Sequence, residues 1–290
     1  MTNQRQKVGY LFIAPALLII AAVSLYPIFY EVYLSLTDWY LLKRRNPVWD
    51  GLNGYRRLWD DHVFWASLVR TLYWAGGTVA LEYLIAMPLA LLLNRRSRLN
   101  GVMTGVILLP WVMPTIVVAY TWRWLLDAQY GTVHDLLHRV GLVSNRSVLT
   151  DPHKVLPALI FISAWKGAPF MTIALLATMK SIPGELYEAA ALDGASLWRQ
   201  FRDVTLPLLR TVSVVMSLVL AIFAFYSFDI VWVITKGGPG DATLLVGVYL
   251  FRAFFERLEF SYAATMGIAM LVMLIGFAAV YLRVLQRTAD

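Results

Sequence analysis

Three charged side chains lie inside long apolar stretches of this 290-residue chain, and they are the first candidates for chemistry. They are Glu82, Lys166 and Asp229. A charge at the centre of a membrane-spanning helix costs roughly 2.5–3.5 kcal/mol on insertion scales, so it marks a functional site by default. Three roles stay open for each: a hydrogen-bonding group inside a helix bundle, a lining residue on a solute path, or a contact with another subunit.

Aromatic side chains stand beside one of these charges. Tyr226 and Trp232 flank Asp229, and we predict that these three residues and Glu82 line a solute path. An aromatic ring stacks on the apolar face of a sugar, while polar neighbours bind the sugar hydroxyls. Packing inside the protein is the commoner reason for such rings, and that alternative stays open.

A second aromatic group surrounds the first two apolar stretches. It comprises Trp39, Trp49, Trp59, Trp65 and Trp74. Tryptophan is enriched where a membrane meets water, because its ring is apolar and its N–H is polar. We therefore interpret these five side chains as an aromatic belt at the head-group level.

One pair of histidines has the spacing of a zinc site. His134 and His138 are four residues apart, which places both imidazoles on one face of a helix. Asp135 stands where zinc proteases carry glutamate, and only Asp151 and His153 lie nearby as further ligands. We expect no metal site here and interpret the pair as solvated side chains on a short surface helix.

The signatures of an enzyme are missing from the sequence. There is no Gly-x-x-x-x-Gly-Lys-Ser/Thr loop for ATP phosphates, no Gly-x-Ser-x-Gly and no dinucleotide fingerprint after a strand. The chain also has no cysteine, which excludes disulfides and thiol ligands. We expect no catalytic residue and no cofactor bound by this chain.

The composition points to a membrane protein. The chain is 59% hydrophobic and 15% charged, whereas an average soluble domain is roughly 45–50% apolar and about 25% charged. The net charge of +7 comes from small groups of Lys and Arg between apolar stretches. Contact with anionic lipids explains this distribution, and no basic stripe for nucleic acid is formed.

Six apolar windows are long enough to cross a membrane as helices, which takes about 20 residues each. They are 8–30, 71–93, 102–122, 155–179, 211–235 and 260–282. The first window is too long for the core of a signal peptide, so we predict that it is retained. The alternating pattern of a β-barrel is absent, and the predicted fold is all-α, with one transmembrane domain over residues 1–290.

An even number of spans places both termini on one side of the membrane. Raw counts of Lys and Arg favour neither side, but their density favours termini inside. The short basic loop 94–101 supports the same orientation, because short loops follow the positive-inside rule best.

The long polar interruption 180–210 predicts two short helices. Ser181 and Pro183 are typical of a helix start, and Glu185 would face the positive end of the helix dipole. Asp193-Gly194 predicts the end of that helix, because glycine tolerates a left-handed turn.

We predict a second short helix from Ala195 to Phe201, with the next span beginning at Leu206-Pro207. Small side chains at the turn let the backbone of another protein approach closely. The interruption is therefore predicted to be a docking surface.

The same interruption resembles the EAA motif of ABC importer permeases. That motif reads Glu-Ala-Ala, three residues, Gly, nine residues, Ile, one residue, Leu-Pro. The chain has Glu188-Ala189-Ala190, Gly194, Val204 and Leu206-Pro207, and its only departure is valine for isoleucine.

Further stretches are similar to the carbohydrate importers of the maltose, trehalose and glycerol-phosphate group, in particular to the first of their two permeases. One is Phe-Asp-Ile-Val-Trp-Val-Ile-Thr-Lys-Gly-Gly-Pro at 228–239. The others are 11–39 with Ala14-Pro15 and Tyr26-Pro27, and 51–55, where Gly54 departs from the expected pattern. The large extracytoplasmic insertion of the maltose permease is absent.

The resemblance implies a type I ABC importer permease fold in the cytoplasmic (inner) membrane of a bacterium or archaeon. The implied partners are a second homologous permease, two ATPase subunits, an extracytoplasmic solute-binding protein, a sugar or sugar-like solute and membrane lipids. ATP and Mg would bind the ATPase subunits and not this chain. Both termini and 180–210 would lie in the cytoplasm.

The resemblance also assigns roles to residues. The helices at 185–201 would dock on an ATPase, and the residues implied in this coupling are Glu185, Glu188, Ala189, Ala190, Asp193, Gly194, Ala195, Leu206 and Pro207. The rival reading is a self-contained secondary transporter or channel subunit, which would need its own coupling-ion site and commonly inverted repeats.

Overall fold

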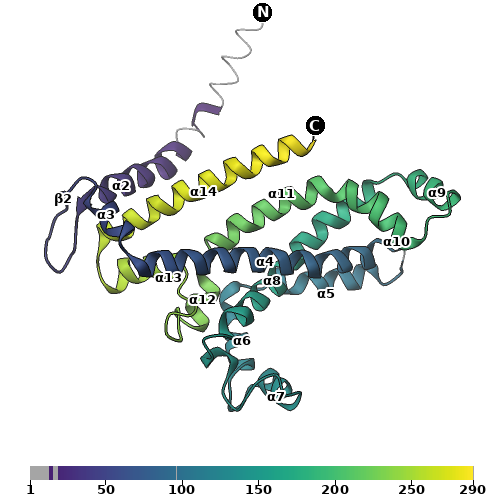
Figure 1. Cartoon of the computed structure of the whole chain (residues 1–290), viewed down its shortest axis with the longest axis horizontal. Helices are drawn as coiled ribbons and strands as arrows, with labels where there is room; N and C mark the ends of the chain where they lie inside the picture. The colour runs from purple at the N-terminus through teal and green to yellow at the C-terminus, as the bar shows by residue number, and fades with distance from the viewer. Residues whose placement is uncertain (1–12, 16–18, 96, 290) are drawn as a thin grey trace, which may run out of the picture. The chain divides into compact units, whose positions relative to one another are not determined.

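The computed structural model describes residues 13–15, 19–95 and 97–289, and they are mostly helical (Figure 1). The longer helices are α2 (Tyr26–Ser35), α4 (His62–Asn94), α5 (Asn100–Val112), α6 (Thr115–Leu125), α8 (Val155–Ser181), α11 (Leu206–Phe225) and α14 (Phe260–Ala289). The shorter ones are α3 (Asn53–Trp59), α7 (Thr132–Arg139), α9 (Gly184–Leu192), α10 (Leu197–Gln200), α12 (Asp229–Ile234) and α13 (Val246–Phe251). Wide π-helical turns cover Ala21–Leu25, Phe201–Thr205 and Arg252–Glu256, and Val148–Thr150 is a 3-10 turn.

One small hairpin departs from the all-helical prediction. Strands β1 (Thr37–Asp38) and β2 (Val48–Trp49) pair antiparallel, with Thr37 opposite Trp49. Residues 31–70, which separate the first two apolar windows, are largely regular structure, since α2 extends into them, α3 lies within them and α4 begins in them.

Four helical runs in the described part of the chain are long and apolar enough to cross a membrane. They are His62–Asn94, Val155–Ser181, Leu197–Ile234 and Phe260–Tyr281. A bent pair, α5 and α6, raises the number to five if it counts as one span. The window 8–30 lies partly outside the described residues, so the six-span arrangement stays a prediction.

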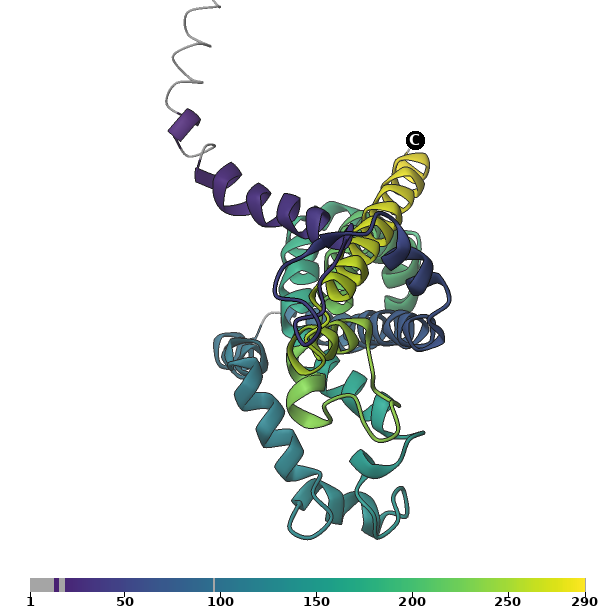
Figure 2. The ribbon, with the colours of Figure 1, turned by 90° about the vertical axis from the view of Figure 1, so that its left-hand side faces the viewer.

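The window 102–122 is not one straight span, as the sequence predicted. α5 and α6 meet at an angle of 91° (Figure 2). Pro114 clashes with a helical residue before it, and Met113 is accordingly extended, with φ −65° and ψ 136°. The proline therefore ends α5 and starts a new helix in another direction.

The window 211–235 is also interrupted. α11 ends at Phe225, and α12 begins at Asp229 after three residues that are not helical. The predicted span is thus one long helix followed by a separate short one, and Asp229 lies at the junction.

The chain divides into two compact units. Among the described residues, one contains those up to 64 together with 249–276, and the other contains those from 65 to 248 together with 277–289. The single domain over 1–290 stays a prediction.

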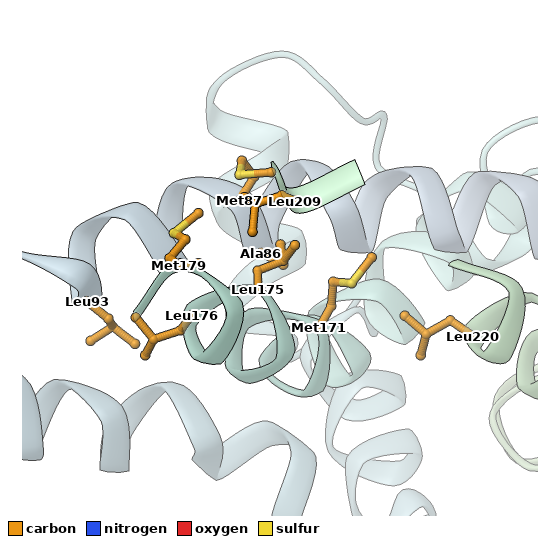
Figure 3. Packing of buried hydrophobic residues seen from close by; sticks show 10 residues of the cluster. Ala86, Met87, Leu93, Met171, Leu175, Leu176, Met179, Leu209 and Leu220 are labelled. Carbon is orange, nitrogen blue, oxygen red and sulfur yellow. The ribbon is translucent and has the colours of Figure 1, made fainter. Parts of the chain in front are cut away.

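The apolar core of the second unit joins α4, α8 and α11 (Figure 3). Its buried members are Ala86, Met87, Ala90, Leu93, Met171, Leu175, Leu176, Met179, Leu209 and Leu220. Small alanines on α4 let the helices approach, while flexible methionines fill the irregular gaps between them. This packing positions the polar residues on the same three helices.

The prediction that Trp74 belongs to an aromatic belt at the head-group level is wrong. The Trp74 side chain is fully buried, and its Nε1–H donates to the backbone carbonyl of Ala224 at 3.1 Å. This indole is part of the interior of the second unit and ties α4 to the end of α11. Trp49 and Trp59 are exposed, as a belt requires.

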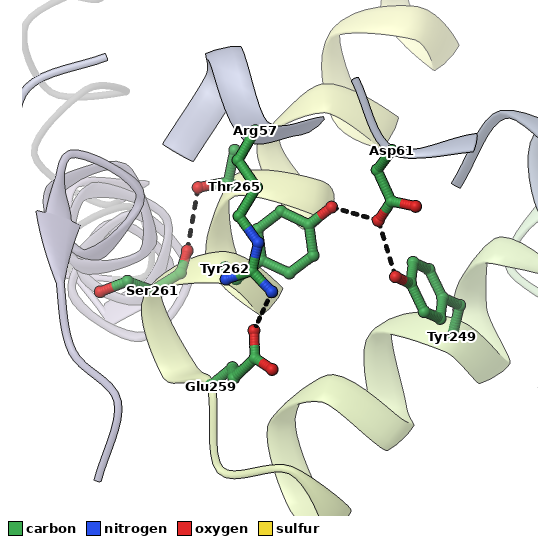
Figure 4. A network of polar contacts seen from close by, with 7 residues as sticks. All are labelled: Arg57, Asp61, Tyr249, Glu259, Ser261, Tyr262 and Thr265. Atoms are coloured by element: carbon green, nitrogen blue, oxygen red, sulfur yellow. Dashed lines mark hydrogen bonds and ion pairs between the residues drawn. The ribbon is translucent and has the colours of Figure 1, made fainter. Parts of the chain in front are cut away.

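A polar network organises the first unit (Figure 4). The hydroxyls of Tyr249 and Tyr262 both donate to the Asp61 carboxylate, the former at 2.6 Å. Arg57 pairs with Glu259 at 2.5 Å and lies over the Tyr262 ring. Burial raises the pKa of Asp61, but the hydrogen bonds from the two tyrosines and from the Phe64 and Val63 amides outweigh it, so this pKa lies below its ordinary value.

Candidate functional site

A cavity of about 580 Å³ opens among the helices of the second unit. Both interrupted spans contribute to it, since Trp111 and Thr115 flank the bend between α5 and α6, and Tyr226, Ser227 and Phe228 form the break after α11. Non-helical backbone at membrane depth is tolerated where it is buried in protein or lines a water-filled cavity. The remaining lining residues are Thr78, Glu82, Ser163, Lys166, Gly167, Phe170, Leu220, Phe223, Ala224, Asp229 and Ile230.

Glu82 is the most deeply buried charged residue of this cavity. Its side chain is 5% exposed, and its Oε2 has no hydrogen-bond partner among the described residues. The other carboxyl oxygen lies against Gly167 of α8, where a β-carbon would overlap it. Glycine is therefore required at 167 for this carboxyl group to enter the helix contact.

Lys166 and Asp229 line the same cavity, so the structure brings together all three charges that interrupt apolar stretches. The sequence identified Lys166 as a costly charge but did not place it on the predicted solute path. The sequence signal that could have placed Lys166 in the cavity is the neighbouring Gly167, since a glycine in a helix allows a close contact. The sequence alone does not show which face of that helix turns inward.

Aromatic rings form part of the cavity wall. Trp111 and Phe170 stack with ring centroids 5.6 Å apart and planes 12° apart. Tyr226 lines the cavity with half of its surface exposed. Trp232 is not a lining residue, but its ring stacks on that of the lining residue Phe228, with centroids 5.4 Å apart. Three of the four predicted path residues, Glu82, Tyr226 and Asp229, thus share one cavity.

The stretch 228–239 continues from the cavity wall into a tight loop. Lys236 and Gly237 have positive φ values of 53° and 97°. The Thr243 hydroxyl donates to the carbonyl of Gly238 at 2.8 Å and lies 2.7 Å from the Thr235 hydroxyl. These hydrogen bonds fix the loop that follows α12.

The second candidate site is the exposed elbow formed by α9 and α10. α9 ends where Gly194 adopts φ +76°. The Ala195 amide donates to the Ala190 carbonyl at 2.9 Å, and the Gly194 amide donates to Ala191 at 3.0 Å. This pair of bonds is a Schellman cap, which satisfies the last carbonyls of α9 and favours glycine at the left-handed position.

Two further contacts hold the elbow together. The hydroxyls of Tyr187 on α9 and Thr205 lie 3.0 Å apart, and the Gln200 amide donates to the Ala195 carbonyl at 3.1 Å. The Ser196 side chain caps α10 by accepting from the Arg199 amide. The predicted helix–turn–helix is therefore present, and its two arms contact each other.

The start of α9 differs from the prediction in one respect. α9 begins at Gly184 after Pro183, with Glu185 in its first turn, as expected. Ser181 is instead the last residue of α8, where its hydroxyl donates to the Thr178 carbonyl at 2.8 Å, and Ile182 is extended because it precedes Pro183.

The second arm of the elbow is not separate from the next span, contrary to the prediction. α10, the π-helical turn Phe201–Thr205 and α11 follow one another without a break. Pro207 cannot donate a backbone hydrogen bond and would crowd the preceding turn. The wide turn directly before it accommodates the proline, so the helix continues to Phe225.

The elbow presents its predicted coupling residues to the surface. Of those named above, Ala190 and Ala195 are half-buried, and the others are exposed. Large apolar side chains are exposed beside them: Leu192 at 89%, Leu197 at 80% and Trp198 at 69%. Exposed apolar groups on a polar helix pair mark an interaction surface.

The histidine pair also departs from its prediction. His134 is buried, and its Nδ1 has no hydrogen-bond partner in the described part of the chain, whereas His138 is exposed on α7. The rings lie 6.4 Å apart. Among residues 13–15, 19–95 and 97–289, no group of three metal-ligating side chains is close enough to hold an ion.

The fold and the site define the class: a multi-helix membrane protein with a polar cavity between its helices and an exposed helical elbow. Residues 82–290 match the family described as binding-protein-dependent transport system inner membrane component. The chain belongs to this family and is the permease component of an ABC transporter. The family predicted from the sequence is confirmed, and with it the prediction that the chain is an inner-membrane protein.

Two curated relatives and one solved structure show the range of this likeness. The chain is 34% identical to the trehalose/maltose transport system permease protein MalF of Thermococcus litoralis, over 96% of this chain and 93% of the relative. It is 31% identical to the sulfoquinovosyl glycerol permease SmoG of Agrobacterium fabrum, over 97% and 90%. A bacterial ABC transporter that imports alginate shares the fold, with TM-score 0.84, 22% identity and coverage of 99% and 98%.

Proposed function

We propose that this chain forms half of the pathway of an ATP-driven importer for a sugar or sugar-like solute. The observation that carries the proposal is one uninterrupted helical run, Leu197 to Phe225. It begins in the exposed elbow and ends at the wall of the cavity. A displacement of the elbow by a partner would reach the cavity through this helix. The trehalose/maltose relative supports the solute class.

The partners follow from the same proposal. A second homologous permease would complete the pathway, two ATPase subunits would bind ATP and Mg, and a solute-binding protein would deliver the solute from outside. The elbow and both termini would lie in the cytoplasm, with six helices across the membrane. The exposed apolar side chains Leu192, Leu197 and Trp198 suit a groove on an ATPase subunit.

The mechanism uses the two ends of the long helix. Closure of the ATPase subunits would move α9 and α10, and the contact of Tyr187 with Thr205 ties α9 to the π-helical turn that follows α10. α11 would transmit this motion to Tyr226–Asp229 in the cavity wall. Access to the cavity would then change from one side of the membrane to the other.

The test is a loss of coupling in the reconstituted transporter with all its subunits. Gly194→Val forces a branched side chain into φ +76° and adds bulk at the elbow, and Glu188→Lys reverses an exposed charge on α9. We expect both variants to insert normally but to lose most of the uptake that ATP hydrolysis drives. The measurements are solute uptake, ATP hydrolysis stimulated by the binding protein, and the amount of permease in the membrane.

Gly141→Val is the matched control. Gly141 also has φ +76°, has open space around its Cα and closes α7 with the same pair of capping bonds. It therefore carries the same backbone strain at a different place. Normal coupling in the Gly194 and Glu188 variants, or an equal loss in the Gly141 variant, contradicts the proposal.

A further inference from the structure

One turn of α4 holds both ends of a segment that forms part of the cavity wall. This wall segment comprises residues 225–245, and its stretch from Tyr226 to Ile230 lines the cavity. The backbone just before it, at Ala224, and the backbone just after it, at Val246, each bond to a side chain of α4. The wall segment therefore begins and ends against the same helix.

The first bond comes from Trp74. Its indole Nε1–H donates to the Ala224 carbonyl at 3.1 Å, and the side chain is fully buried. Ala224 lies in the last turn of α11, where the helix no longer supplies an amide four residues ahead. The same carbonyl accepts from the Ser227 amide at 3.0 Å, so the indole is bonded directly to the start of the break.

The second bond is made by Thr71. Its hydroxyl accepts from the Val246 amide at 2.9 Å and donates to the Ser67 carbonyl at 2.8 Å. Val246 is the first residue of α13, so its amide has no carbonyl partner within that helix. Thr71 and Val246 are both fully buried, and an amide left without a partner there carries the desolvation cost of a buried donor. The threonine thus caps α13 from another helix.

The two anchors lie on the face of α4 that also reaches the cavity. Thr71 and Trp74 are three residues apart, which is one helical turn, and Glu82 follows further along the same face. A continuous helix keeps these side chains at fixed separations. The Arg123 guanidinium of α6 adds a bond to the Val233 carbonyl at 3.2 Å, but Arg123 is exposed, so water competes for this bond. The buried attachment of the wall segment is therefore the one to α4.

We propose that Thr71 and Trp74 are positioning residues that clamp the wall segment in its resting place and so restrain the transporter until the solute and its binding protein arrive. The inference rests on the proposed function, in which α11 carries motion from the elbow to the cavity. A restraint at one end of a rigid helix also restrains the other end, because the coupling free energy between two sites acts in both directions. Without the clamp, the elbow would move and ATP would be hydrolysed even when no binding protein is present.

The first measurement is amide hydrogen exchange in the complete purified complex, read by mass spectrometry. Thr71→Val keeps the shape of the side chain and removes the hydroxyl, and Trp74→Phe keeps an aromatic ring and removes the N–H. We expect amides within 225–246 to exchange roughly fivefold or more faster in both variants, the worth of one buried hydrogen bond, while α8 exchanges as in the wild type. Unchanged exchange of the wall segment in both variants overturns the proposal.

The second measurement is ATP hydrolysis by the complete complex in proteoliposomes without binding protein, together with the uptake per ATP when binding protein is added. We expect hydrolysis without binding protein to rise several-fold in both variants and the uptake per ATP to fall. Faster exchange with normal hydrolysis would make the two bonds purely structural, which also overturns the proposal. Thr71→Ser keeps an accepting hydroxyl and is expected to retain wild-type values, which separates the lost hydrogen bond from a folding defect.

Two substitutions of the same kind are matched controls. Thr172 on α8 is also fully buried, but its hydroxyl donates to the Ala168 carbonyl of its own helix, so Thr172→Val removes a bond within one helix. Trp39→Phe removes a buried N–H that has no partner among the described residues. Both are expected to match the wild type, and an equal effect in them overturns the proposal. The exchange measurement does not depend on the elbow, so the clamp can fail while the Gly194 and Glu188 variants still lose coupling, and the reverse.

Discussion

At the scale of single residues, two glycines leave space for a carboxyl group from a neighbouring helix. Gly167 contacts Glu82 in the second unit, and Gly267 on α14 contacts Glu31 on α2 in the first. Small residues at helix contacts let polar groups approach where a β-carbon would exclude them. Glu31 was overlooked in the sequence because the predicted window ended one residue before it, whereas α2 continues to Ser35.

The Asp61 carboxylate gives a prediction for the dependence of stability on pH. Its pKa is depressed in the folded chain, so its contribution to stability is full above the ordinary aspartate value and is lost as the pH falls through the folded pKa. We expect Asp61→Asn to lower the melting temperature of the purified complex at pH 7, and this difference to shrink below about pH 4. Tryptophan fluorescence melting curves between pH 7 and pH 3.5 measure it.

Asp60→Asn is the control, because Asp60 is the exposed neighbour of Asp61. It is expected to melt like the wild type at every pH. If the Asp61→Asn difference is the same at pH 7 and pH 3.5, the hydrogen-bonded carboxylate is not its origin.

At the scale of elements, the two proline-containing junctions differ in what precedes the proline. Pro114 follows an extended residue and turns the chain through 91°, whereas Pro207 follows a π-helical turn and leaves the helix continuous. One junction thus opens space beside the cavity, and the other joins the elbow to α11. The rigidity of this second junction is testable.

The prediction is that the continuous helix from α10 into α11 transmits the motion of the elbow. Replacing both exposed residues Arg202 and Asp203 with glycine weakens the helix by about 1 kcal/mol per residue. We expect assembly to persist while the uptake driven by each ATP hydrolysed falls several-fold. Uptake and ATP hydrolysis in proteoliposomes measure this ratio.

The double alanine variant at Arg202 and Asp203 is the matched control, since it removes the same side chains and keeps a strong helix former. It is expected to retain nearly the wild-type ratio. Equal losses in the glycine and alanine variants would assign the effect to the side chains and not to helix continuity.

At the scale of the whole molecule, the orientation in the membrane connects the elbow with its proposed ATPase. The sequence contains no cysteine, so single cysteines report accessibility without a background. Leu192 on the elbow and Leu142 after α7 are both well exposed, at 89% and 63%. They lie in segments that the proposed topology places on opposite sides.

In membranes that contain the permeases without the ATPase subunits, which would cover Leu192, we expect Leu192→Cys to react with a membrane-impermeant maleimide only in inside-out vesicles. We expect Leu142→Cys to react only in intact cells or right-side-out vesicles. Mass-tag gel shifts measure the reaction, and detergent-permeabilised samples serve as the control in which both react. Labelling of both from one side would contradict the topology with both termini and the elbow in the cytoplasm.

Several elements were predictable because their signals are local. The apolar windows predicted α4, α8 and α14, and the pair Asp193-Gly194 predicted the end of α9. The extent of these helices was less predictable, since α4 begins at His62, outside its apolar window. Hydropathy detects the part of a helix that faces lipid or core, but it does not detect polar turns that continue the same hydrogen-bond pattern.

The sequence by itself determined the membrane class, the family and the elbow, because composition, helix caps and motif spacing depend on residues near each other in the chain. Only the tertiary structure decided that Glu82, Lys166 and Asp229 share one cavity, that Trp74 is buried and that Trp232 does not line the cavity. An apolar helix shows no polar face to indicate which side turns inward. That choice is made by packing, and here the carboxyl group of Glu82 against Gly167 is part of that packing.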